Sequence, residues 1–217
     1  MIDPAVQRTN MVESQIRPSD VTDRRVLRAM AAVPRERFAP EALRSVAYAD
    51  QALPLGHGRQ MLAPRLVARM IQALELDGDS IALEIATATG YGAAVLARIA
   101  QTVVALESDA SLANEATKAL AELGADNVAV VTGTLADGYE QEGPYDAILV
   151  SGAVAVEPDV LLDQLKDGGR IVAVVTSGDL GRVVQWRRSG AAFACRTLFE
   201  ATAHVLPGFE RKAEFVF

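Results

Sequence analysis

Apolar side chains in the first third of the chain recur at helical spacing. Asp23 is placed to cap the second of these segments, Pro34 to end it, and Pro64 to begin a later helix. The predicted elements are helices at residues 5–16, 23–32, 36–45 and 64–74, and a loop at residues 48–63. The N-terminal third is therefore expected to be a helical extension.

From residue 80 the pattern changes to short apolar runs that alternate with helical segments. Strands are predicted at residues 80–85, 102–106, 127–132, 147–151 and 170–176, and helices at residues 93–100, 110–123 and 159–165. This alternation predicts a mostly parallel sheet that is covered on both faces. Residues 182–187 and 191–199 predict a closing antiparallel hairpin, and residues 212–217 a last strand.

Length and charge narrow the class of protein. The chain has 217 residues, half of them apolar, and we divide it into residues 1–76 and 77–217. Its formal charge of −7 argues against a broad nucleic-acid surface. No apolar run is long enough to span a bilayer, and the first residues carry no leader pattern, so we expect a soluble cytoplasmic protein with no membrane partner.

Metal and thiol chemistry are not expected. Two histidines and one cysteine are too few for a typical transition-metal site. Cys195 lies in a strand-like run, where we expect a buried structural thiol rather than a nucleophile. His57 has no identifiable partner acid in the sequence, so a role as general base is not expected.

The junction between the strand at residues 80–85 and the next helix is the most informative segment. It is a turn of small residues, the arrangement by which an α/β sheet brings its backbone close to a nucleotide-like ligand. Glu84 ends the strand, and Glu107 ends the following one. A carboxylate at the second position can accept hydrogen bonds from both hydroxyls of a ribose, which predicts a role for Glu107 in cofactor binding.

Each of these residues also has a purely structural interpretation. Glu84 could interact with the dipole of the following helix, and Glu107 could be a solvated acid at a helix start. Ala86 and Ala88 stand where such loops usually carry glycine. If their φ angles are negative, alanine fits at little cost; if they are positive, each methyl group strains the loop by ~1 kcal/mol or more.

Short motifs along nearly the whole chain carry a family resemblance. They are Met11-Val12-Glu13-Ser14-Gln15-Ile16, Val33-Pro34-Arg35-Glu36-Arg37-Phe38, Ala47-Tyr48-Ala49-Asp50, Leu53-Pro54-Leu55-Gly56-His57-Gly58, Leu83-Glu84-Ile85 and Gly168-Gly169-Arg170. In this order the chain resembles the protein-L-isoaspartate O-methyltransferases. The resemblance implies a Rossmann-like class I methyltransferase fold, with a seven-stranded, mostly parallel sheet, an antiparallel hairpin at its end and an N-terminal helical extension. It also implies S-adenosylmethionine as cofactor and damaged proteins or peptides with L-isoaspartyl residues as partners.

The chain departs from the family pattern at positions of the active-site segment and the cofactor loop, so it resembles a divergent member. The family's Gly-Gln-Thr-Ile-Ser-x-Pro is here Gly58-Arg59-Gln60-Met61-Leu62-Ala63-Pro64. Leu62 thus replaces the active-site serine and Gln60 the threonine. The family's cofactor loop Gly-Thr-Gly-Ser-Gly is here Ala86-Thr87-Ala88-Thr89-Gly90. Thr134 stands where the family has an acidic residue after the glycine, and Ser151-Gly152-Ala153-Val154 replaces the family's Thr-Ala-Ala-Pro.

These comparisons lead to one set of predicted site residues. Gln60 and Leu62 are expected to face the acceptor. The predicted cofactor-binding residues are Glu84, Ala86, Thr87, Ala88, Gly90, Glu107, Thr134 and Leu135. The resemblance implies methylation of isoaspartyl carboxylates, a reaction of the sulfonium that needs no metal. Two alternatives stay open: a catalytically impaired member with a binding or regulatory role, and a methyltransferase with a different acceptor. A dinucleotide oxidoreductase does not explain the N-terminal motifs.

Overall fold

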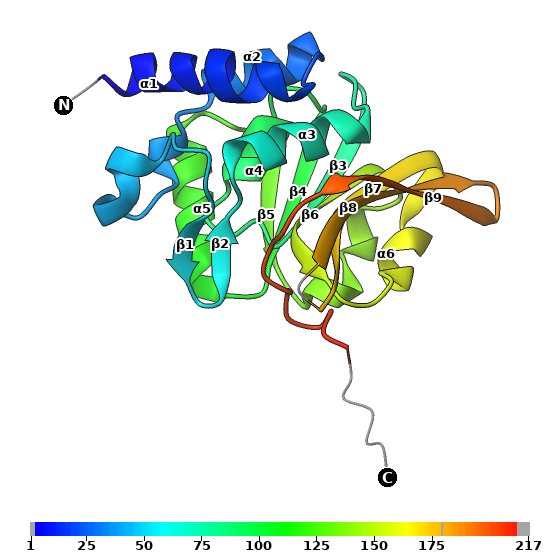
Figure 1. Ribbon diagram of the computed structural model, residues 1–217. Helices are drawn as coiled ribbons and strands as arrows, with labels where there is room; N and C mark the ends of the chain where they lie inside the picture. Colours follow the sequence, from blue (N-terminus) through cyan, green and yellow to red (C-terminus); the bar gives the residue numbers. More distant parts are fainter. Residues whose placement is uncertain (1–2, 179, 212–217) are drawn as a thin grey trace.

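A seven-stranded sheet forms the centre of the molecule (Figure 1). The computed structural model describes residues 3–178 and 180–211, so the strand predicted at residues 212–217 lies outside the described residues. The strand order is β5-β4-β3-β6-β7-β8-β9. The bounds are β3 Ile81–Ile85, β4 Thr102–Glu107, β5 Val128–Thr132, β6 Tyr145–Val154, β7 Leu165–Ser177, β8 Leu180–Ser189 and β9 Ala192–Glu200.

The strands from β5 to β7 are parallel, and β8 and β9 close the sheet as an antiparallel meander. Parallel strands that alternate with helices bury both faces, and two separate apolar clusters lie on the two sides of the sheet. The helices are α3 Pro64–Leu74, α4 Tyr91–Leu96, α5 Ala110–Glu122 and α6 Asp159–Asp163. The first three pack in one cluster, and α6 packs in the other. The predicted fold is confirmed.

The N-terminal extension packs on α3 and α4 rather than standing apart (Figure 1). Its helices are α1 Pro4–Met11, which continues through a π-helical turn at Val12–Ile16, and α2 Arg24–Ala32. The Asp23 carboxylate accepts a hydrogen bond from the backbone N–H of Arg25, so the predicted cap is confirmed. One apolar cluster runs from Met11 into the main sheet. The division after residue 76 stays a prediction.

The helix predicted at residues 36–45 is wrong. The segment consists of two short 3₁₀ turns, Arg35–Arg37 and Glu41–Val46. Pro40 stands between them with an extended backbone. A proline has no N–H to donate and disfavours helical geometry in the residue before it, so one continuous helix cannot form.

The loop predicted at residues 48–63 contains a hairpin, which corrects that prediction. Strands β1 Leu53–Gly56 and β2 Arg59–Met61 pair antiparallel and form their own two-stranded sheet. Gly56, His57 and Gly58 all have positive φ and make the turn. Strands of three and four residues are too short to show a period, which is why the pattern missed them. In Figure 1 the hairpin lies beside α5, apart from the main sheet.

Cys195 is exposed, so the prediction of a buried thiol is wrong. It lies on β9, the last strand in the sheet order, opposite the buried Trp186 of β8. An edge strand has a neighbour on one side only, and most of β9 is exposed. Among the residues that the structure describes, no helix has the length and apolar character needed to cross a membrane.

Candidate functional site

The turn after β3 has the backbone geometry of a glycine loop although it carries alanines. Ala86 and Ala88 have φ angles of 61° and 51°, and Gly90 has a φ of 92°. The N–H of Thr87 donates to the carbonyl of Leu106 at 3.1 Å, which ties the turn to β4. For an L-residue this left-handed geometry costs about 1–2 kcal/mol. The strained case of the sequence analysis is therefore the correct one.

Glu84 is buried at the end of β3 and braces this turn. Its Oε2 accepts a hydrogen bond from Thr87 Oγ1 at 2.7 Å, and its Oε1 accepts one from Ser151 Oγ at 2.5 Å. The backbone N–H of Ala93 in α4 also donates to it. Burial raises the pKa of Glu84, and these three hydrogen bonds oppose that rise.

The first turn of α4 approaches the Glu84 carboxylate closely. A Cβ built at Gly92 would overlap the carboxylate, so this position requires glycine. The acid thus lies at the start of a helix, as in its structural interpretation, and it also lines the cavity described below.

Glu107 is fully buried at the end of β4, and its main partner is Arg59 of the hairpin. Nη2 of Arg59 lies 2.9 Å from Oε1 of Glu107, and the two side chains are 3% and 0% exposed. Arg59 Nη2 also donates to Ser108 Oγ at 2.6 Å. The charged pair therefore fixes the hairpin against the loop between β4 and α5.

Backbone N–H groups complete the surroundings of the Glu107 carboxylate. Oε1 accepts from Ser108 at 2.7 Å and from Asp109 at 3.0 Å, and Oε2 accepts from Ala88 at 2.9 Å. The structure shows a buried acid at this position and not the solvated acid of the alternative interpretation. A buried carboxylate requires such partners, because it loses the hydrogen bonds of water.

A small cavity lies between the hairpin segment and the turn after β3. Its lining joins both groups of predicted residues: Leu55, Gln60, Met61, Leu62, Val67, Glu84, Ala86, Thr87, Ala88, Thr89, Tyr91, Gly92 and Ser151. The volume is about 20 Å³. That is room for about one water molecule, whereas sites for small ligands span roughly 300–1,000 Å³.

Arg35 anchors the segment that carries Leu62. This buried guanidinium donates to the carbonyls of Ala47 and Leu62, each at 2.7 Å, and stacks 4.6 Å from the ring centre of Tyr91. Desolvation lowers the pKa of Arg35. Leu62 is itself 3% exposed, so its backbone and side chain are both fixed.

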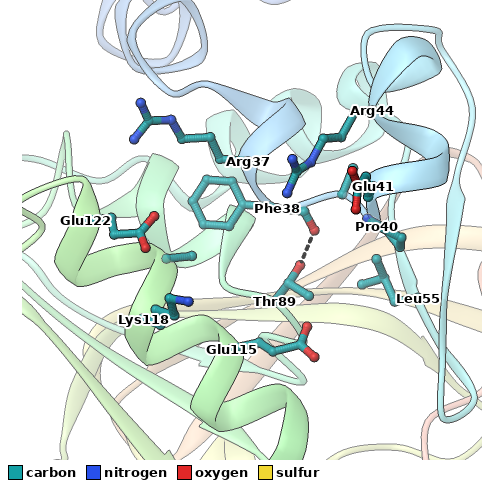
Figure 2. Close-up of a pocket in the computed structure, with 12 residues that line it drawn as sticks. Arg37, Phe38, Pro40, Glu41, Arg44, Leu55, Thr89, Glu115, Lys118 and Glu122 are labelled. Carbon is teal, nitrogen blue, oxygen red and sulfur yellow. Dashed lines mark hydrogen bonds between the residues drawn. The ribbon is translucent and has the colours of Figure 1, made fainter.

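A larger, open hollow lies next to the small cavity, between the 3₁₀ turns and α5 (Figure 2). Its volume is about 500 Å³, and charged side chains of both signs line it: Arg37, Arg44, Lys118, Glu41, Glu115 and Glu122. Thr89 Oγ1 donates to the carbonyl of Phe38 at 2.8 Å and, with Leu55, lines both spaces. This hydrogen bond joins the turn after β3 to the N-terminal extension.

Four predicted residues do not line the cavity: Gly90, Glu107, Thr134 and Leu135. Glu107 is joined to its wall through the Ala88 N–H. Gly90 ends the turn and begins α4. Thr134 and Leu135 follow β5; Thr134 is exposed, and Leu135 is buried in the second apolar cluster. Gly133 N–H donates to the carbonyl of Glu107 at 3.1 Å, which places this segment at the same sheet edge as Glu107.

Two side-chain contacts between the hairpin and the β4–α5 region could not be predicted from the sequence. The first is Arg59 with Glu107. Its only signal in the sequence was that Arg59 stands where the family pattern has glutamine. The second is His57, for which no partner acid was expected: its Nδ1 lies 2.8 Å from Oδ2 of Asp109 at the exposed end of the hairpin. Both partners are distant in sequence, and the pairing depends on a hairpin that the pattern did not predict.

Comparisons with known proteins agree on one family. A family model described as protein-L-isoaspartate(D-aspartate) O-methyltransferase matches residues 6–206. Protein-L-isoaspartate O-methyltransferase 1 of Rhodopseudomonas palustris (strain HaA2) is 47% identical over 171 residues, which cover 79% of this chain and 70% of that protein.

Two solved structures extend the comparison to the fold. A protein-L-isoaspartate O-methyltransferase superposes with a TM-score of 0.83 at 25% identity, over 93% of this chain and 66% of that one. A Plasmodium falciparum protein, described as a protein-L-isoaspartate O-methyltransferase in complex with S-adenosyl-L-homocysteine, has a TM-score of 0.78 at 21% identity, over 92% and 97% of the two chains. The first match spans slightly less than two thirds of its partner's length.

Proposed function

The chain belongs to the protein-L-isoaspartate(D-aspartate) O-methyltransferase family, and on this premise we propose that it methylates the carboxylate of L-isoaspartyl residues in damaged proteins, with S-adenosylmethionine as methyl donor. One observation of the structure supports this most directly. The turn after β3, Glu107 of β4 and the Gln60–Leu62 segment meet at the carboxyl ends of adjacent parallel strands. Ligands of open α/β sheets bind at this edge.

The residue types at this edge fit the proposed cofactor. Glu107 is a buried acceptor suited to the two hydroxyls of a ribose, and the left-handed turn presents backbone rather than long side chains. The proposed cofactor-binding residues are Glu84, Ala86, Thr87, Ala88, Gly90, Glu107, Thr134 and Leu135. The cavity, at about 20 Å³, is too small for this cofactor, so we propose that the hairpin moves when the cofactor binds.

The bound cofactor supplies a methyl group on a sulfonium, and the chain supplies placement and exclusion of water. An in-line displacement gains most from both effects. We propose that Gln60 and the backbone of residues 59–62 orient the acceptor, because Leu62 has no hydrogen-bonding group. Arg35 keeps that backbone in place through the Leu62 carbonyl. The cytoplasmic location and the absence of nucleic-acid partners stay predictions.

The direct test is transfer of labelled methyl from S-adenosylmethionine to an isoaspartyl peptide, with the matching aspartyl peptide as control. We expect transfer to the isoaspartyl peptide only. Glu107→Ala should weaken binding of S-adenosylhomocysteine about ten- to a hundredfold, the range for hydrogen bonds to a charged group. Cys195→Ser, on the exposed edge strand, is the matched variant that should leave transfer unchanged. Absence of methyl transfer together with absence of S-adenosylhomocysteine binding would contradict the proposal.

A further inference from the structure

We propose that Arg59 is a latch that holds the β1–β2 hairpin closed over the cofactor site, and that it competes with the cofactor for the carboxylate of Glu107. The proposal rests on the proposed function, because it takes Glu107 as the acceptor of the ribose hydroxyls. It adds a residue that sets cofactor affinity and the rate at which the site opens.

The hydrogen bonds around Glu107 make this competition unavoidable. A carboxylate offers about four lone-pair sites. Oε1 accepts from the backbone N–H groups of Ser108 and Asp109 and from Arg59 Nη2 at 2.9 Å; Oε2 accepts from the Ala88 N–H and lies 3.3 Å from Arg59 Nε. These five donors already exceed the four sites. The ribose hydroxyls and the guanidinium are both donors. They therefore need the same oxygens and cannot bind to them together.

The shape of the site leads to the same conclusion. Gln60, Met61 and Leu62 lie over Ala86 and Thr87 with only about 20 Å³ between them. A nucleoside needs a pocket at least ten times larger. Cofactor entry therefore requires Gln60 and Met61 to move away from the turn, while Arg35 holds the Leu62 carbonyl. Arg59 lies in the same strand as Gln60 and Met61.

The hairpin lies outside the hydrogen-bond network of the main sheet, and its inner residues Leu53 and Met61 pack in the first apolar cluster. β1 and β2 pair only with each other and are not part of the seven-stranded sheet. The Arg59–Glu107 pair holds the strand, and the His57–Asp109 pair holds the turn. The His57–Asp109 contact is half-exposed, whereas the Arg59–Glu107 pair is buried, so Arg59 makes the main charged contact of the hairpin.

Binding of S-adenosylhomocysteine to three variants tests the latch. Arg59→Gln removes the charge; Arg59→Lys keeps a point charge but loses the two-nitrogen contact. If the open form is about one tenth populated, release of the latch tightens the apparent dissociation constant roughly tenfold. We expect Arg59→Gln to show this gain with a faster association rate, and Arg59→Lys an intermediate one. Arg17→Gln, which makes the same charge change on the exposed Glu13 pair, should bind like the unmodified chain.

Calorimetry gives the affinities, and stopped-flow fluorescence of a labelled S-adenosylhomocysteine analogue gives the association rates. Circular dichroism checks that each variant folds. If Arg59→Gln does not fold, the binding of Arg59→Lys decides the test. Equal or weaker binding by both Arg59 variants, with the unmodified chain binding normally, overturns the latch and leaves the proposed function intact. No binding by any protein in the series overturns the proposed function and the latch with it.

Discussion

The carboxyl ends of β3 and β4 each carry one buried acid, and the two acids are held in different ways. Glu84 receives its hydrogen bonds from Thr87, Ser151 and the start of α4, all of them uncharged groups. Glu107 is neutralised by Arg59, which sits on a separate two-stranded sheet. The first acid belongs to the fixed frame of the sheet. The second depends on an element that can leave, and so it can exchange its partner for a ligand.

Glu107→Ala should produce the largest loss of stability. It leaves the Arg59 guanidinium buried without a counter-charge, which costs about 3–5 kcal/mol in typical buried pairs. Urea denaturation of Glu107→Ala, Arg59→Ala and the double variant measures the coupling. If Glu107→Ala lowers the free energy of unfolding by less than ~1 kcal/mol, the Arg59 side chain becomes solvated at little cost. The contrast between the two acids would then be weaker.

Glu84→Ala should destabilise the chain by about 2 kcal/mol. It leaves the hydroxyls of Thr87 and Ser151 and one α4 N–H without an acceptor, and a buried unsatisfied donor costs ~1–3 kcal/mol. Thermal unfolding measures the change. Ser151→Ala, which removes one of these donors, is the matched milder variant. Equal effects of both changes would mean that the Glu84 carboxylate contributes little beyond the Ser151 contact.

The pH dependence of stability tests the surroundings of Glu84. Burial raises the pKa of Glu84 in the folded chain above its unfolded value. The folded state then binds the proton more tightly, so the contribution of Glu84 to stability is full at low pH and falls as the pH rises through the folded pKa. Compared with Glu84→Gln, the unmodified chain should therefore lose stability as the pH rises. A difference that does not change with pH would contradict the direction of this shift.

Leu62→Ser combined with Gln60→Thr tests the acceptor side of the site. The hydroxyls are expected to raise kcat/KM for an isoaspartyl peptide about tenfold or more, because a charge-assisted hydrogen bond of ~1.5–3 kcal/mol made only in the transition state has that effect. The labelled-methyl assay measures the rate. Loss of the Leu62 side chain from the core lowers stability, so unfolding is followed in parallel. An unchanged rate in a folded variant would show that backbone placement suffices.

Ala86→Gly with Ala88→Gly should have the smallest effect. Glycine relieves the left-handed strain but makes the unfolded chain more flexible, so the two contributions nearly cancel in stability. Removal of two methyl groups from the cavity wall should tighten S-adenosylhomocysteine binding by about threefold, or less than 1 kcal/mol. Ala121→Gly, at an exposed position in α5, shows the cost of glycine without the relief. Weaker binding in the double variant would mean that the methyl groups support the ligand.

The sequence could predict the sheet because its evidence is local. Buried parallel strands are continuous apolar runs, and residues such as Asp23 and Pro64 mark the boundaries of helices. The same logic located the turn at residues 86–90 and both acids. It could not show that Ala86 and Ala88 have positive φ, because either sign is compatible with the same letters.

The state of the site could not be predicted, because it depends on contacts between distant segments. Arg59 and Glu107 are 48 positions apart, and they meet only because a short hairpin folds back over the sheet edge. Strands of three and four residues carry no periodic signal. The sequence therefore indicated which residues gather at the edge, whereas the structure shows which of them face one another.

Arg35 has a consequence for how the molecule opens. One side chain holds the carbonyls of Ala47 and Leu62, which are 12 and 27 positions away, and covers the ring of Tyr91. The extension, the active-site segment and the first turn of α4 thus share a single guanidinium. Replacement of Arg35 should raise the rates of amide hydrogen exchange in all three segments together, because they form one unit of local unfolding. The β1–β2 hairpin joins this unit at Leu62, whereas its own buried ion pair, Arg59 with Glu107, does not involve Arg35.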